Sequence, residues 1–327
     1  MPEQLVDGFG RAARDLRISL TDRCGLRCTY CMPAEGLEWI PRADLLTDGE
    51  LLRLTAIFAG LGVASARLTG GEPLLRPTAA AIVRGLVAQG YDTALTTNGV
   101  QLADHAEALA AAGLRRVNVS LDTLRRSRFL AMTRRDRFDD VLAGSAAALA
   151  AGLRPVKVNS VLLRGVNDDE AADLLAFCLD AGYELRFIEQ MPLDPQHSWD
   201  RGRLVTGEEI LDRLSRRWTL TPESPTDSAP AKTWLVDGGP ARVGVIASVT
   251  APFCASCDRL RLTADGQLRT CLFARTETDL RGPLRAGASE AELVALVADA
   301  VRGKAAGHGI GAPEFVQPHR PMSAIGG

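Results

Sequence analysis

Strand-like and helix-like segments alternate along the first two-thirds of this 327-residue chain, and this alternation limits the fold more than any other feature. The predicted strands are short apolar or β-branched runs at Leu16–Leu20, Ala66–Leu68, Thr93–Thr96, Val117–Leu121, Pro155–Leu162 and Leu185–Ile188. The predicted helices lie between them at Thr47–Ala59, Thr78–Gln89, Leu102–Ala112, Phe138–Ala151 and Asp169–Ala181. Strands joined by helices pair in parallel. The pattern therefore predicts an α/β fold with a parallel sheet, either barrel-like or doubly wound.

The pattern changes in the last third of the chain. A Pro/Ser-rich segment at 221–232 predicts an exposed loop. Beyond it we predict short strands at Arg242–Ser248 and Arg259–Thr263 and a helix at Ser289–Arg302. We therefore expect two regions, a main one over 1–220 and a smaller one over 233–327.

The composition excludes some classes of function. Hydrophobic residues make up 46% of the chain and charged residues 24%, as in ordinary globular proteins. The formal net charge of −2 gives no field for a general nucleic-acid binder, so local Arg and Lys clusters must hold any anionic ligand. No apolar run reaches the roughly 20 residues of a membrane span, and the first residues show no secretory signal. We expect a cytoplasmic protein that binds neither membranes nor nucleic acid.

The seven cysteines fall into two tight groups and one isolated residue. Cys24, Cys28 and Cys31 form a C-x3-C-x2-C loop directly after the first predicted strand, whereas Cys178 is expected to be a core thiol. An odd number of grouped cysteines without an export signal favours metal ligation over disulfides. Three thiolates from one loop leave one iron of a [4Fe–4S] cluster free. A zinc site is the alternative for such a triplet.

Polar residues follow the predicted strands, at the end where parallel α/β folds bind ligands. Gly70, Gly71 and Glu72 follow the second strand. Two adjacent glycines let the backbone approach a ligand closely, and Glu72 could pair with an ammonium group. This turn and the cysteine loop together favour a cluster over zinc.

The smaller region contains the second cysteine group, Cys254, Cys257 and Cys271. None of the four histidines lies near it in sequence, which again suggests a cluster with an open iron. A zinc site completed by a distant histidine stays open. Arg259 and Arg261, just after Cys257, would share one face of a strand. Two guanidinium groups on one face suit a polyphosphate.

The string LRISLTDRCGLRCTYCMP, followed by RLTGGEPLLR, resembles the radical S-adenosylmethionine (SAM) superfamily. This resemblance implies an α/β fold, a partial (β/α)6 TIM-like barrel with a smaller C-terminal cluster-binding region. It also implies that the amino and carboxylate groups of SAM bind the open iron. One electron from the reduced cluster would then cleave SAM to a 5′-deoxyadenosyl radical.

The string CASCDRLRLTADGQLRTCLF, the segment FIEQMP and the C-terminal Ile325-Gly326-Gly327 are similar to the GTP 3′,8-cyclase family of molybdenum cofactor biosynthesis. The resemblance implies two [4Fe–4S] clusters, on Cys24, Cys28 and Cys31 and on Cys254, Cys257 and Cys271. SAM-binding positions fall on Tyr30, Gly71, Glu72, Ser120 and Met191. GTP-binding positions fall on Arg17, Arg67, Thr96, Lys157, Arg259, Leu260 and Arg261, with Thr97 as the alternative to Thr96 and Arg186 as a further candidate. The expected catalytic residues are Arg17, Arg259, Arg261, Gly326 and Gly327.

The activity implied by this resemblance is a lyase reaction on GTP. The radical would abstract the hydrogen from C3′ of the ribose, and C3′ would attack C8 of guanine to give (8S)-3′,8-cyclo-7,8-dihydroguanosine 5′-triphosphate. The implied partners are a cyclic pyranopterin monophosphate synthase, a reductase or flavodoxin-type electron donor and, as a candidate assembly, a second copy of the chain. Two alternatives remain: a peptide-modifying radical SAM enzyme with an auxiliary cluster, and a non-catalytic zinc or iron–sulfur protein.

Overall fold

The six strands predicted in the first two-thirds of the chain form the centre of a curved sheet in the computed structural model, which describes residues 4–224, 228–312 and 314–326. They are β1 (Asp15–Ser19), β2 (Ser65–Thr69), β3 (Asp92–Thr97), β4 (Arg116–Ser120), β5 (Val156–Val161) and β6 (Glu184–Ile188). Neighbouring strands of this series pair in parallel. Every predicted strand end is confirmed to within one residue, because each β-branched or apolar run is bounded by turn residues.

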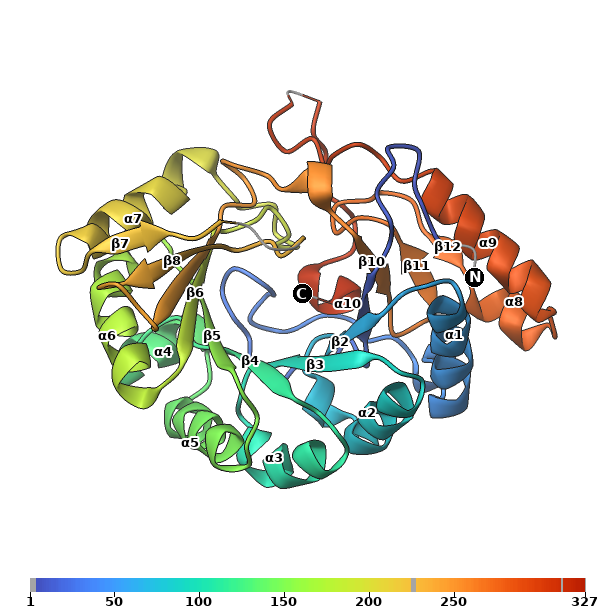
Figure 1. Ribbon diagram of the computed structural model, residues 1–327, viewed down its shortest axis with the longest axis horizontal. Helices are drawn as coiled ribbons and strands as arrows, with labels where there is room; N and C mark the ends of the chain where they lie inside the picture. Colours follow the sequence, from blue (N-terminus) through green and yellow to red (C-terminus); the bar gives the residue numbers. More distant parts are fainter. Residues whose placement is uncertain (1–3, 225–227, 313, 327) are drawn as a thin grey trace.

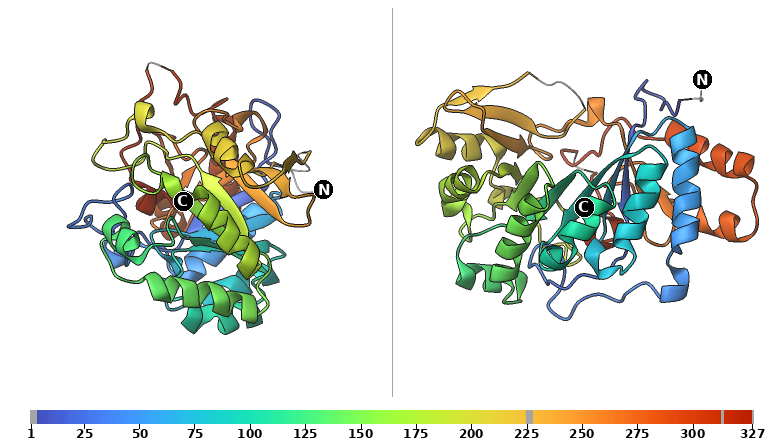
Figure 2. Two further views of the ribbon diagram at one scale, coloured as in Figure 1. Left: turned by 90° about the vertical axis from the view of Figure 1, so that its left-hand side faces the viewer. Right: turned by 60° about the horizontal axis from the view of Figure 1, so that its bottom comes forward.

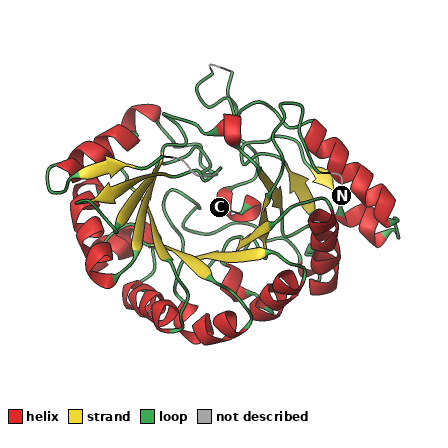
Figure 3. Ribbon diagram, in the orientation of Figure 1, coloured by secondary structure: helices red, strands yellow, loops and turns green. Residues whose placement is uncertain are grey.

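The five predicted helices are also confirmed, and they cover the outer face of the sheet (Figure 1). They are α1 (Asp48–Gly60), α2 (Ala79–Ala88), α3 (Leu102–Ala111), α5 (Phe138–Ala150) and α6 (Ala171–Ala181). Strands form the inner arc and helices the outer one (Figure 3). The sequence analysis missed α4 (Arg126–Thr133), because the segment RSRFLAMT has no continuous apolar stripe.

The last third of the chain extends the same sheet at both edges. On one side β9 (Arg242–Ile246) pairs in parallel with β6, and β8 (Lys232–Val236) and β7 (Leu220–Pro222) follow antiparallel. On the other side β10 (Arg259–Leu262) pairs in parallel with β1, and β11 (Gln267–Arg269) and β12 (Thr278–Asp279) follow antiparallel. In the described ranges the sheet has twelve strands with β7 and β12 as free edges, so the arc is open. This confirms a partial barrel.

The described residues of this later part of the chain form four α-helices: α7 (Gly207–Ser215), α8 (Arg281–Arg285), α9 (Glu290–Arg302) and α10 (Met322–Ile325). The β7–β8 hairpin and the α8–α9 pair lie at opposite ends of the molecule in two views (Figures 1 and 2). The division of the chain at 220 and 233 stays a prediction. Among the described helices, none is long and apolar enough to cross a membrane.

The two faces of the sheet have different chemistry. Along β1, Leu16 and Ile18 are fully buried in the core between sheet and helices, whereas Arg17 lines a cavity on the concave side. This follows from the two-residue period of a strand. The C-terminal helix α10 lies at the centre of the ring, inside the arc (Figure 1). The concave side is therefore the place where polar side chains and the chain terminus meet.

Candidate active site

Three arginines stand side by side on the concave face of the sheet. Arg17 of β1 is the register neighbour of Arg261 on β10 and of Arg67 on β2. Register neighbours on adjacent strands project to the same face. All three side chains line a cavity of about 590 Å³ enclosed by the arc of strands. The sheet therefore concentrates positive charge at one wall of this cavity.

A second polar row continues along the arc. Thr96, Asn118 and Lys157 are register neighbours on β3, β4 and β5, and all three line the cavity. The Asn118 amide donates a hydrogen bond to the Thr96 hydroxyl at 3.3 Å. Thr97 projects away from the cavity, and its hydroxyl donates to the buried carboxylate of Glu72 at 2.7 Å. The structure therefore brings Thr96, and not Thr97, to the cavity.

The carboxylate of Asp15 lies among the arginines. It is 2.8 Å from the Arg17 guanidinium and 3.8 Å from that of Arg259. Burial opposes ionisation of Asp15, but the charges of Arg17, Arg67 and Arg259 outweigh it and lower its pKa. Burial and repulsion from the other arginines lower the pKa of Arg261 to about 9. Because cationic side chains outnumber acidic ones along this wall, its field suits a polyanion.

The second cysteine group opens onto the same cavity. Cys254 begins a short 3-10 turn (Cys254–Ser256) before β10, Cys257 follows that turn directly, and Cys271 follows β11. Antiparallel pairing of β10 with β11 returns Cys271 to the other two, and all three line the cavity. Burial raises the pKa of the Cys271 thiol, and the nearby Cys257 and Cys254 add to this effect. Three thiols facing one hollow fit a cluster held at three corners and open at the fourth.

His308 also lines this cavity, but its ring is already engaged by the main chain. The amide of Ile310 donates to Nδ1 at 3.2 Å, and Nε2 lies 3.1 Å from the carbonyl oxygen of Ser248. Its position does not suit a fourth metal ligand, and it is the only histidine among the described residues of the cavity wall. In the described part of the chain, no group of three or more His, Cys, Asp or Glu side chains is placed to hold a single metal ion.

The first cysteine loop follows β1. The Asn98 side-chain amide donates a hydrogen bond to the Cys24 sulfur at 3.7 Å. The backbone N–H of Ser323 in α10 donates to the Cys31 sulfur. Burial raises the pKa of Cys28 well above its usual value, and the neighbouring Cys31 and Cys24 raise it further. An iron cluster relieves this repulsion by binding all three thiolates. The donor set fits a cluster with one free iron.

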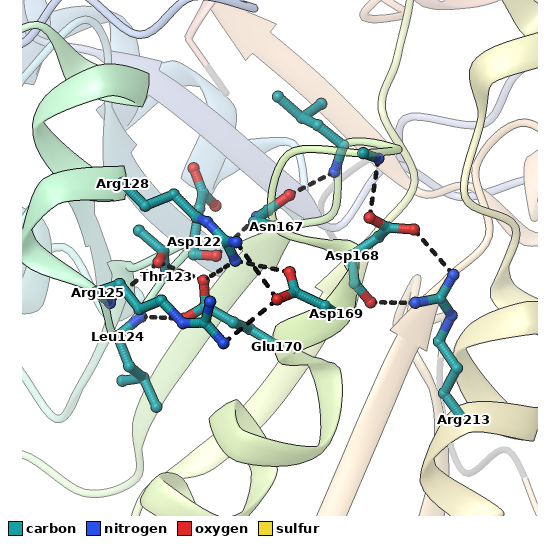
Figure 4. A network of polar contacts seen from close by, with 12 residues as sticks. Asp122, Thr123, Leu124, Arg125, Arg128, Asn167, Asp168, Asp169, Glu170 and Arg213 are labelled. Atoms are coloured by element: carbon teal, nitrogen blue, oxygen red, sulfur yellow. Dashed lines mark hydrogen bonds and ion pairs between the residues drawn. The ribbon is translucent and has the colours of Figure 1, made fainter.

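Tyr30, between two of these cysteines, ties the loop to the end of β4. Its hydroxyl donates to the Asp122 carboxylate at 2.7 Å, and the Val161 amide donates to the same carboxylate at 2.8 Å. Burial raises the pKa of Asp122 to about 6, although these two hydrogen bonds oppose the shift. The Asn167 side chain donates to the Asp122 carbonyl at 2.7 Å (Figure 4). Tyr30 thus anchors the cysteine loop, to which it belongs, at the end of β4.

Glu170 fixes the rest of the loop after β4. Its carboxylate accepts hydrogen bonds from the Thr123 hydroxyl at 2.6 Å and the Leu124 amide at 2.8 Å. It also pairs with Arg128 of α4, and only 1% of Glu170 is exposed (Figure 4). A buried carboxylate from one βα unit therefore stabilises the strand end of another.

Glu72 does the same for the loop after β3. Its carboxylate accepts from the Thr97 hydroxyl at 2.7 Å and the Asn98 amide at 2.7 Å. Burial raises the pKa of Glu72 to about 7. A Cβ atom on Gly71 would lie 2.3 Å from the Arg23 carbonyl oxygen, so only glycine lets this turn pack on the cysteine loop. Gly71 and Glu72 thus have structural roles, and their SAM contacts stay predictions.

The other predicted site residues lie in different environments. Met191 and Lys157 line the cavity. Ser120, half-buried at the end of β4, is the register neighbour of Asn159, which lines the cavity. The side chain of Leu260 is fully buried in the core on the helix side of β10. Only the main chain of Leu260 is therefore available for a GTP contact.

The tail ends inside the arc, at the arginine wall. Arg261 donates a hydrogen bond to the Gly326 carbonyl oxygen. Gly326 has φ 88°, and a Cβ there would lie 3.0 Å from the Thr69 methyl group and 3.3 Å from the Ser19 Cβ. The absence of a side chain permits this approach. The other residue of the predicted pair, Gly327, lies outside the described residues.

Sequence reasoning missed several side chains of the cavity wall. Asn118, Asn159 and Arg116 line it, and Phe253 lies under the Arg259 guanidinium, 4.6 Å from ring centroid to carbon. The strand period could have found the asparagines, since each occupies a concave-face position two residues from another polar one. Nothing in the sequence indicated that Phe253 would line the cavity, because its position depends on the conformation of the loop before β10.

Family models match two successive parts of the chain. A model described as the radical SAM superfamily matches residues 18–178, and one described as Molybdenum Cofactor Synthesis C matches residues 183–310. The crystal structure of Streptococcus suis SuiB shares the fold with a TM-score of 0.59 at 14% identity, over 90% of this chain and 68% of that one. The open βα arc and the cysteine loop after its first strand thus define the radical SAM class.

Curated relatives narrow the class to one family. The GTP 3′,8-cyclase of Streptomyces coelicolor is 61% identical over 99% of this chain and 96% of that protein. The GTP 3′,8-cyclase of Mycolicibacterium smegmatis is 56% identical over 99% of this chain and 92% of that protein. The chain belongs to the GTP 3′,8-cyclase family.

Proposed function

We propose that this protein is a radical SAM lyase that converts GTP to (8S)-3′,8-cyclo-7,8-dihydroguanosine 5′-triphosphate, an early step of molybdenum cofactor biosynthesis. The observation that carries the proposal is the register of Arg17, Arg67 and Arg261 around the cavity onto which the second cysteine group opens. A triphosphate bound by the arginines would leave its nucleoside within reach of that cysteine group.

Two [4Fe–4S] clusters and SAM supply chemistry that no side chain of this protein can provide. Cys24, Cys28 and Cys31 would hold the first cluster, which would supply the electron for cleaving SAM to the 5′-deoxyadenosyl radical that abstracts H3′ of GTP. The C3′ radical would then add to C8 of guanine, and one further electron and one proton from the external donor and solvent would complete the product. Cys254, Cys257 and Cys271 would hold the second cluster, which would supply an open iron as a binding site for the purine. The protein contributes binding, orientation and exclusion of water.

The residues around the first loop orient SAM. Tyr30 is immobilised by its hydrogen bond to Asp122, so its ring position does not depend on the ligand. Gly71 presents backbone without side-chain bulk, and Ser120 and Met191 supply polar and apolar contacts. Preorganisation of this kind lowers the entropy lost when the cofactor is bound.

The arginines and Lys157 bind the triphosphate, and the tail completes the wall. The Asp15 carboxylate lies 2.8 Å from the Arg17 guanidinium and 3.8 Å from that of Arg259, so its charge offsets the repulsion between the two cations. Bidentate contacts from guanidiniums fix phosphate groups in one orientation. Gly326, bound by Arg261, places backbone where a side chain would collide with the strand ends. Fixed substrate geometry limits the radical to one C–H bond.

The expected partners follow from this chemistry. The protein needs a one-electron donor, for which a reductase or flavodoxin-type protein is suited. Its product would pass to a cyclic pyranopterin monophosphate synthase. We further propose a cytoplasmic location and a homodimer as the assembly to test.

The decisive experiment uses GTP deuterated at C3′. The anaerobically reconstituted, reduced protein is mixed with SAM and the labelled GTP, and the 5′-deoxyadenosine formed is analysed by mass. Deuterium in the 5′-deoxyadenosine supports the proposed substrate and abstraction site together. Unlabelled 5′-deoxyadenosine would reject C3′ of GTP as the target and favour a peptide-modifying activity.

A further inference from the structure

Lys304 is a buried cation close to the second cysteine group. It follows α9, and only 5% of its surface is exposed. Lysine is almost never buried to this degree without a charged partner. In the described part of the chain, no carboxylate forms an ion pair with its ammonium group, whereas the neighbouring Arg11 pairs with Asp7 at 2.6 Å. The folded protein therefore keeps a positive charge here despite the free-energy cost of burying it.

All three donors of the Lys304 ammonium have acceptors on Cys257 or at the start of β10. The group lies 2.8 Å from the Cys257 carbonyl oxygen, 3.0 Å from the Arg259 carbonyl oxygen and 3.8 Å from the Cys257 sulfur. An ammonium has three N–H donors, so this geometry satisfies every one. Lys304 therefore holds both the main chain and the thiol of one cysteine of the triplet.

We infer that Lys304 is a positioning residue for the second cluster, and that its charge compensates the negative charge of the thiolate-bound iron. The inference rests on the proposed second cluster and goes beyond it by naming what stabilises it. A positive charge and an N–H donor at a ligand sulfur both favour the reduced cluster, because reduction adds negative charge.

A structural role without charge is the competing explanation. Lys304 joins the segment after α9 to the start of β10, and hydrogen bonds alone could account for that. The two explanations differ in which substitutions they tolerate. Lys304→Gln keeps neutral N–H donors, whereas Lys304→Arg keeps the charge.

The test separates the second cluster from the first. In the full chain carrying Cys24→Ser, Cys28→Ser and Cys31→Ser, all bound iron belongs to the second triplet. We would measure the iron content, the rate of iron release to a chelator, and the reduction potential by titration followed with electron paramagnetic resonance. The exposed Lys232→Gln is the matched control for the loss of one positive charge.

We expect Lys304→Gln to release iron several-fold faster and to shift the potential to more negative values, while Lys304→Arg and Lys232→Gln stay near the parent. Lys304→Asn, which also keeps neutral N–H donors without the charge, replaces the glutamine variant if the latter does not fold. An unchanged potential in Lys304→Gln, or equal iron loss in the Gln and Arg variants, overturns the inference. If the parent itself binds no iron, the proposed second cluster fails instead.

Discussion

Arg261 donates a hydrogen bond from its guanidinium to the carbonyl oxygen of Gly326, and so joins the C-terminal tail to the arginine wall of the cavity. Arg261 is also the register neighbour of Arg17. The same side chain therefore contacts the tail and shapes the proposed triphosphate site. Substitutions in the tail should therefore affect substrate binding by displacing the Arg261 guanidinium.

Gly326→Ala should lower turnover by about 10- to 100-fold. The new Cβ would meet the Thr69 methyl group at 3.0 Å, and φ 88° is unfavourable for alanine. Strain of about 1–3 kcal/mol would displace the tail, and each 1.4 kcal/mol corresponds to about a tenfold change. The measurement is the initial rate of GTP consumption. Gly311→Ala, where the added atom meets open space, is the control. Equal rates in both variants would remove the tail from the mechanism.

Lys157→Met should weaken GTP binding by about 10- to 100-fold, since a charge-assisted hydrogen bond contributes about 1.5–3 kcal/mol. Lys157 lines the cavity in register with Asn118, so the lost contact is local. Equilibrium binding of GTP measures the effect, and SAM cleavage in the absence of GTP should be unchanged. The exposed Lys232→Met loses the same charge outside the cavity and should bind GTP normally. An equal loss of GTP affinity in both variants would instead assign the effect to the net charge of the protein.

The two cysteine groups should support different steps, SAM cleavage for the first group and GTP cyclisation for the second. Cys271→Ala should reduce the iron content from about eight to about four atoms per chain and abolish GTP cyclisation, yet leave SAM cleavage detectable. Cys28→Ala should abolish SAM cleavage altogether. Cys178→Ala is the control, because that thiol is fully buried in the apolar core. Iron content that is insensitive to Cys271→Ala would contradict the second cluster.

The stability of the helical layer should depend on pH through Glu50. Hydrogen bonding to Arg285 of α8, together with the cap at Thr47, lowers the pKa of Glu50 from 4.5 to about 2. A lowered folded-state pKa means that the stabilisation is complete above pH 4.5 and disappears as the pH falls toward 2. Glu50→Gln should therefore lower the unfolding free energy by about 1 kcal/mol at pH 7.

The difference in unfolding free energy between the parent and Glu50→Gln should shrink below pH 4.5. Urea unfolding of the metal-free protein at several pH values measures this difference. Glu208→Gln removes an exposed carboxylate from the first turn of α7 and serves as the control. A difference that is independent of pH would assign the effect to packing.

Local sequence patterns were sufficient for the elements and for the cysteine loops. The period of apolar residues placed β1 to β6 to within one residue, because each strand buries its own apolar face whatever its neighbours are. Cys24, Cys28 and Cys31 lie within one short loop, so their spacing alone predicted a shared metal group. These features depend on residues close together in the chain.

Only the tertiary structure decided which distant residues share the cavity. Pairing of β10 with β1 sets Arg261 beside Arg17, and that register cannot be read from either strand alone. Likewise the orientation of β3 decided between Thr96 and Thr97, and the segment after α9 brought Lys304 to Cys257. The physical reason is that local hydrophobic patterns determine strands and helices, whereas long-range packing determines which of their polar faces meet.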